Sequence, residues 1–104
     1  MTSYRLTPEA ERDLDDIADY LIEQGGPSLV RHVHGAIEDG MEFLSRTPGA
    51  GHWRTDLTDA PVKFWPVFSY LIVYDAETQP IGIARVLHGA QDLASLFSDT
   101  PPKA

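Results

Sequence analysis

The sequence predicts an α+β domain in which a helical hairpin packs on one face of a small, largely antiparallel sheet. The expected order of elements is β-α-α-β-β-β, followed by a short C-terminal helix. Two amphipathic helical patterns fill the first half and are separated by a Gly-Gly-Pro break at residues 25–27. Three β-rich runs with short connections fill the second half, which favours antiparallel pairing. The 104 residues suit one domain, expected at residues 1–98 with a flexible tail at 99–104.

A short strand is expected at residues 3–6, where polarity alternates. Thr7 and Pro8 then provide a helix N-cap and a proline in the first turn. The first helix carries an apolar stripe made of Ala10, Leu14, Ile17, Ala18, Leu21 and Ile22. Acidic residues that include Asp13 and Asp16 occupy the other side, where we expect a solvated face.

The second helix is expected to begin at Pro27 or Ser28 and to end at Arg46, before a Pro-Gly pair. Its apolar stripe consists of Val30, Val33, Ile37, Met41 and Leu44. Because the connection between the two helices is so short, we expect an antiparallel hairpin whose two stripes cover a common surface.

The second half is expected to supply that surface. A long polar loop is predicted at residues 48–61, and the β-rich runs lie at 62–65, 68–74 and 81–87. Pro66 is expected to end the first of these strands or to lie at a bulge, and residues 75–80 form a turn. A terminal helix is expected at 89–97, with Leu93, Leu96 and Phe97 on its inner side.

The charge and composition exclude several classes of protein. Eight basic and 16 acidic residues give a net charge of −8, which opposes binding to nucleic acid through its phosphates. There is no cysteine, so disulfides, thiol nucleophiles and cysteine-based zinc sites are excluded. No apolar run resembles a signal peptide or a membrane span, and we expect a cytoplasmic protein.

No cofactor or metal is expected, because the chain has no phosphate loop, no dinucleotide fingerprint and no convincing set of metal ligands. The Arg85–His88 pair at the end of the last strand is the strongest candidate for chemistry. A cation beside an imidazole could hold a phosphate and transfer a proton, as RNA cleavage requires. Alternatively, Arg85 pairs with a carboxylate such as Asp92, and His88 caps the turn by hydrogen bonding.

Five segments together resemble the RelE/ParE superfamily of type II toxin–antitoxin toxins, most closely its ParE branch. They are YRLTPEAERDL at 4–14, PGAGHWRTDL at 48–57, VKFWPV at 62–67, YLIVY at 70–74 and RVLHGAQDL at 85–93. They follow the family's order along nearly the whole chain. The chain departs from the family at Gln91, where ParE-like toxins often have arginine, so a cation beside Asp92 is missing.

The resemblance implies a toxin that is neutralised by a ParD-like antitoxin, whose extended C-terminal segment wraps it. ParE proteins poison DNA gyrase, whereas RelE relatives cleave messenger RNA on the ribosome. Beyond residue 50 the chain has four basic residues, one of them in the tail, which is few for stabilising a phosphorane. We therefore favour a non-enzymatic gyrase inhibitor that does not bind DNA directly. The alternatives are a metal-independent ribonuclease and a non-toxic interaction module.

If the chain is a ribonuclease, Arg54 and Arg85 would hold the phosphate and His88 would transfer the proton. The candidates for partner binding are Trp53, Arg54, Trp65, Tyr70, Arg85, His88, Leu93, Leu96 and Phe97. Both faces of the expected sheet carry apolar residues, so each face needs a cover. The antitoxin could cover the face opposite the helices, or the loop at 48–61 could close it with Trp53 as a plug.

Overall fold

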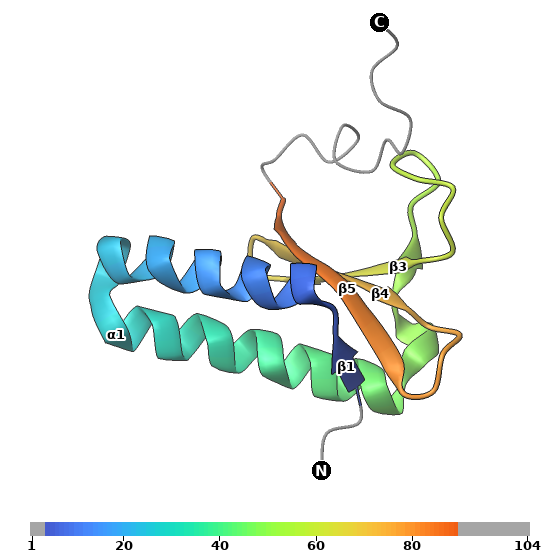
Figure 1. Ribbon diagram of the computed structural model, residues 1–104, viewed down its shortest axis with the longest axis horizontal. Coiled ribbons are helices and arrows are strands. Elements are labelled where there is room, and N and C mark those ends of the chain that lie inside the picture. The colour runs from blue at the N-terminus through green and yellow to red at the C-terminus, as the bar shows by residue number, and fades with distance from the viewer. Residues whose placement is uncertain (1–3, 90–104) are drawn as a thin grey trace, which may run out of the picture.

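The computed structural model describes residues 4–89, and these form a five-stranded sheet with helix α1 against it (Figure 1). The strand order is β1-β5-β4-β3-β2, with β1 parallel to β5 and every other pair antiparallel. The elements are β1 (Tyr4–Leu6), α1 (Pro8–Arg46), the 3-10 helix η1 (Pro48–Ala50), β2 (His52–Trp53), β3 (Lys63–Val67), β4 (Tyr70–Asp75) and β5 (Ile81–His88). The expected α+β class is confirmed, and the expected terminal helix at 89–97 lies almost entirely outside the described residues.

Helix α1 folds back on itself at Gly26, where φ is +80°. Two helical arms, residues 8–25 and 27–46, therefore run antiparallel (Figure 1). Glycine suits this position because a Cβ atom is disfavoured in the left-handed region. Pro27 follows in the first turn of the second arm, where its missing N–H is least harmful. The predicted helical hairpin is confirmed.

Thr7 connects the start of α1 to strand β5. Its hydroxyl accepts a hydrogen bond from the Ala10 backbone N–H at 3.0 Å and donates one to the Ala84 carbonyl at 2.8 Å. Its own backbone N–H donates to the Ile83 carbonyl at 3.1 Å. The N-cap therefore also fixes the start of the first arm beside residues 83 and 84 of β5.

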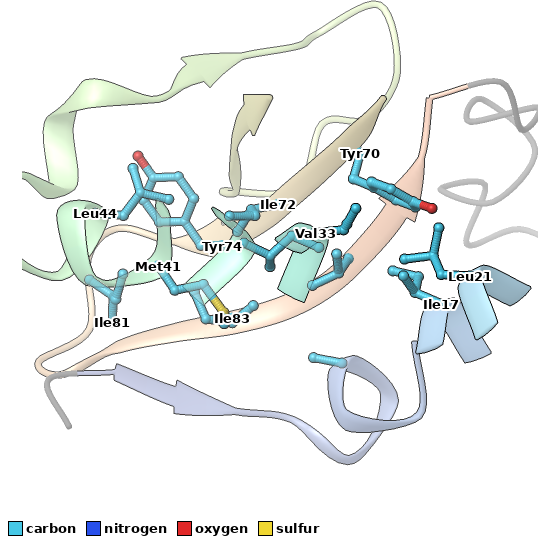
Figure 2. Packing of buried hydrophobic residues seen from close by; sticks show 13 residues of the cluster. Ile17, Leu21, Val33, Met41, Leu44, Tyr70, Ile72, Tyr74, Ile81 and Ile83 are labelled. Atoms are coloured by element: carbon cyan, nitrogen blue, oxygen red, sulfur yellow. The ribbon is translucent and has the colours of Figure 1, made fainter. Parts of the chain in front are cut away.

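The main core lies between the two arms of α1 and one face of the sheet (Figure 2). In Figure 2, Tyr70 lies at the same end of this core as Ile17 and Leu21, and Tyr74 lies near Leu44 at the other end. Most residues of the two predicted stripes contribute to it. Ile22 is an exception, with 47% of its surface exposed, because the tip of the hairpin extends beyond the sheet (Figure 1).

The opposite face of the sheet has a smaller buried cluster of Phe64, Val73 and Leu87. Leu57 and Val62, from the segment that precedes β3, pack against this cluster. The segment therefore covers part of the face opposite the helices, which is one of the two covers that the sequence suggested. Trp53 is not its plug, because 52% of its surface is exposed.

Several boundaries differ from the sequence prediction. Strand β3 continues through Pro66, which pairs with Leu71 in regular register and neither ends the strand nor lies at a bulge. The expected loop at 48–61 contains η1 and β2, and β2 pairs with the start of β3 through Trp53 and Lys63. A strand of two residues is too short to show any periodicity, so only pairing reveals it. Strand β4 begins at Tyr70 because Phe68 and Ser69 form a tight turn after β3. Among residues 4–89, no helix has the length and apolar character needed to cross a bilayer.

Candidate functional site

A cavity of about 370 Å³ opens between the first arm of α1 and the ends of β4 and β5. Cavities with apolar and aromatic walls and a few polar groups are the usual form of binding sites. Its lining residues combine aliphatic, aromatic and acidic side chains: Asp13, Asp16, Ile17, Tyr20, Tyr70, Val86, Leu87 and His88. Of the partner-binding candidates, Tyr70 and His88 meet here.

Arg85 lies beside this cavity and pairs with Asp13 on the first arm of α1. Its Nε and a terminal nitrogen donate to the two carboxylate oxygens at 2.7 and 2.9 Å. These hydrogen bonds raise the pKa of Arg85 above its already high ordinary value. Arg85 therefore pairs with a carboxylate, as one alternative expected, and this carboxylate is Asp13, whose side chain is only 12% exposed rather than solvated. Asp92, the example given in that expectation, lies outside the described residues.

The topology of the sheet explains why Asp13 is needed at this place. Strand β1 pairs with residues 81–83 of β5, and within residues 4–89 the rest of that edge has no neighbouring strand on this side. The Val86 backbone N–H points to this edge and donates to the Asp13 carboxylate at 2.9 Å. Asp13 thus replaces a missing strand as hydrogen-bond acceptor and also neutralises Arg85.

Tyr70 and His88 face each other across the β4–β5 pair, with ring centroids 5.2 Å apart and an edge-on angle of 88°. Burial raises the pKa of the Tyr70 hydroxyl, and nearby Tyr20 raises it further. The hydroxyl therefore stays protonated at neutral pH and remains a hydrogen-bond donor.

Sequence reasoning missed Tyr20 and Asp13 as parts of this site. Asp13 lies three residues after Ala10 and four before Ile17, both of which are buried in the core. A carboxylate at that spacing belongs to the border of the buried stripe rather than to the far side of the helix. This spacing is the feature of the sequence from which a partly buried position of Asp13 could have been predicted.

Arg54 lies at the β2 edge of the sheet, far from Arg85 and His88 on β5. It follows β2, and strands β3 and β4 separate it from β5, a span of about 14 Å at the usual strand spacing. Its guanidinium donates to Asp56 at 2.8 and 3.0 Å, which raises the pKa of Arg54 and lowers that of Asp56. The structure does not bring the three proposed ribonuclease residues together.

The two tryptophans lie near Arg54, at the β2 edge. The Lys63 ammonium lies 5.0 Å from the centre of the exposed Trp53 ring. Trp65 is half-buried between Phe43 and His52, with ring centroids 5.2 and 6.5 Å away. Leu93, Leu96 and Phe97, the remaining partner-binding candidates, lie outside the described residues.

Comparison with known proteins agrees with this fold and with the order of the motifs. The family model described as the ParE toxin of the type II toxin–antitoxin system parDE matches residues 4–93. Toxin ParE of Escherichia coli is 28% identical over 99 residues, which cover 95% of this chain and 96% of that protein.

The fold is also similar to a solved structure titled as the chromosomal ParDE TA system from P. aeruginosa. The TM-score is 0.70 at 22% identity, with 85% of this chain and 96% of that chain covered. The family match spans both edges of the sheet, the helical hairpin and the Arg85–His88 strand. The chain belongs to the ParE family of type II toxin–antitoxin toxins.

Proposed function

We propose that this toxin inhibits DNA gyrase by binding it, without chemistry of its own, and that a ParD-like antitoxin neutralises it in the cytoplasm. The arrangement of the arginines carries the proposal. Arg54 and Arg85 each pair with their own carboxylate, and two strands separate them. A metal-independent ribonuclease needs several cations around one phosphate, and residues 4–89 contain no such cluster around His88.

Two further observations favour protein binding over RNA cleavage. The net charge of −8 opposes entry into an RNA-lined site on the ribosome. The cavity beside His88 has aromatic and aliphatic walls and two carboxylates, and such walls suit protein side chains better than a phosphate backbone.

Purified toxin is expected to block supercoiling by gyrase and to leave messenger RNA intact. Replacing His88 with alanine should change the inhibition by no more than a few-fold, because no proton transfer is involved. Loss of a catalytic histidine would instead reduce activity by about 10²–10⁴-fold. Supercoiling of plasmid DNA and cleavage of a ribosome-bound transcript are measured with the same preparations.

Cleavage of the transcript that disappears in His88→Ala would contradict the proposal and establish a ribonuclease. A toxin that affects neither gyrase nor RNA, and whose induction does not slow growth, would be a non-toxic interaction module. Addition of the antitoxin provides the control, since it should restore supercoiling in proportion to the complex formed.

We place the antitoxin at the β2 edge of the sheet. In the described part of the chain, β2 has only one neighbouring strand, and its two residues, His52 and Trp53, are exposed. An extended segment can add to such an edge through backbone hydrogen bonds while its side chains contact exposed aromatic rings. Trp53, Trp65 and Arg54 supply those contacts, and they lie toward the β2 edge of the sheet, away from His88 on β5.

Trp53→Glu is therefore expected to weaken antitoxin binding at least tenfold, as loss of a central aromatic contact commonly does. Trp53 is the better position for the test, because Trp65 packs against the main core and its replacement would disturb folding. Ile22→Glu is the matched control, since Ile22 is similarly exposed at the tip of the hairpin. Equal affinities of the two variants, measured by calorimetry, would show that the antitoxin docks elsewhere.

A further inference from the structure

The turn between β3 and β4 contains Phe68, and neither the backbone conformation nor burial explains why a phenylalanine lies there. Val67 pairs with Tyr70, so Phe68 and Ser69 form a two-residue hairpin loop. Phe68 has a φ of +54°, whereas Ser69 is not in the positive region. A positive φ at the first loop position is the pattern of a type II′ turn, which favours glycine there. A bulky side chain at positive φ is an outlier.

The Phe68 side chain also gains little from burial. Its surface is 63% exposed, the largest value among the large hydrophobic residues that are exposed in the described part of the chain. A single exposed apolar residue is ordinary, but an exposed apolar residue in a disfavoured backbone conformation is not. When a residue adopts a disfavoured conformation and burial does not compensate for its cost in folding free energy, the position is a candidate for a functional role.

The surroundings of Phe68 hold its ring in place. The His32 ring, from the second arm of α1, stacks against it with centroids 5.5 Å apart. The Gly89 backbone N–H donates to the Ser69 carbonyl at 2.7 Å, which ties the turn to the end of β5. The ring is thus pre-organised, and a pre-organised side chain loses less entropy when it binds.

A groove of about 350 Å³ begins at this turn and includes Tyr70 and His88. The same two residues line the cavity beside α1, so Phe68 stands at the end of a continuous surface. This surface is remote from the β2 edge, because β2 pairs with residues 63 and 64 at the start of β3 and Phe68 follows its end.

We propose that Phe68 is the residue that this toxin inserts into an apolar pocket of its target protein, an inference that rests on the proposed gyrase function. A ring that projects from a tight turn needs a preformed concave site. A folded target can offer such a site, whereas an extended antitoxin segment cannot. The pocket would accept the outer face of the phenyl ring while His32 supports the inner face.

The test compares Phe68→Gly with Phe68→Ala, using toxin released from its antitoxin complex. Both variants remove the ring, but only glycine also removes the cost of the positive φ at residue 68. We expect each to raise the toxin concentration for half-inhibition of supercoiling at least tenfold and to bind antitoxin as the wild type does. Phe68→Gly should melt several degrees above Phe68→Ala. Ile22→Ala, which removes a similarly exposed side chain, should inhibit like the wild type.

Wild-type inhibition by both Phe68 variants would overturn the inference and leave the gyrase proposal intact. Equal losses of antitoxin affinity and of inhibition would also overturn it, because Phe68 would then serve both partners or the fold itself. A melting temperature of Phe68→Gly below that of Phe68→Ala would contradict the backbone argument. Failure of the wild-type toxin to inhibit gyrase is a distinct result, which would overturn the proposed function.

Discussion

Asp13→Ala is expected to lower the free energy of unfolding by about 2–3 kcal/mol, the largest loss from any single acidic residue of α1. The substitution leaves the partly buried Arg85 guanidinium without its anion and the Val86 N–H without its acceptor. The estimate lies below the usual cost of breaking a fully buried pair, because 34% of the Arg85 side chain reaches solvent. Urea unfolding measures the loss.

Asp16→Ala is the matched control. Asp16 is exposed on the same arm, so its loss should change stability by no more than about 0.5 kcal/mol. Replacing Asp13 and Arg85 together with leucine should cost less than Asp13→Ala alone, since no charge is then left unpaired. Equal stabilities of Asp13→Ala and Asp16→Ala would refute this account of the β5 edge.

The contribution of the pair to stability should be insensitive to pH near neutrality. Because Asp13 raises the pKa of Arg85 in the folded state, the resulting stability is fully present below the ordinary pKa of arginine. It is lost only as the pH rises through the still higher folded value. Stability curves of the wild type and Arg85→Leu between pH 7 and pH 9 should therefore run parallel.

Gly51→Ala is expected to destabilise the toxin by about 2–3 kcal/mol through a clash with Tyr74. A Cβ atom at residue 51 would lie 2.7 Å from Cε1 of Tyr74 and would also overlap its hydroxyl oxygen. The ring cannot withdraw, because it is completely buried and its hydroxyl bridges two backbone groups. It accepts from the Gly51 N–H at 2.8 Å and donates to the Pro48 carbonyl at 2.7 Å.

Gly49→Ala is the control, because a Cβ atom there meets nothing within 4 Å. Tyr74→Phe should itself cost about 1–3 kcal/mol, since it leaves the Gly51 N–H and the Pro48 carbonyl without their partner. In the double variant Gly51→Ala/Tyr74→Phe, the alanine no longer meets the hydroxyl. The free energy of unfolding should therefore fall by less than the sum of the losses in the two single variants. Gly51→Ala and Gly49→Ala proteins that unfold at the same urea concentration would disprove the clash.

The helical hairpin was predictable because its signals are local. Thr7, the two apolar stripes and the break around Gly26 act through neighbours within a few residues, so the sequence shows them directly. The strands after residue 62 were predictable for a similar reason, through β-branched and aromatic runs between turn residues. The resemblance to ParE toxins rests on the same ordered segments, and the family match covers them.

The candidate site was only partly predictable. His88 was named from its place at the end of the last strand and Tyr70 as a candidate for partner binding, and the register of β4 and β5 brings them face to face. Asp13 was assigned to a solvated face, although Val86 and Arg85, more than 70 residues further along the chain, require it at the edge of β5. Arg54 was grouped with Arg85 from charge alone, and the strand order separates them.

The sequence by itself determined the class of fold, the hairpin, the central strands and the family. Periodicity, caps and turn residues encode these features within short windows. Only the tertiary structure decided which carboxylate completes β5, which glycine must leave room for Tyr74, and that Phe68 occupies a turn position suited to glycine. These depend on register and on strand order, which join residues far apart in the chain through contacts that no local pattern encodes.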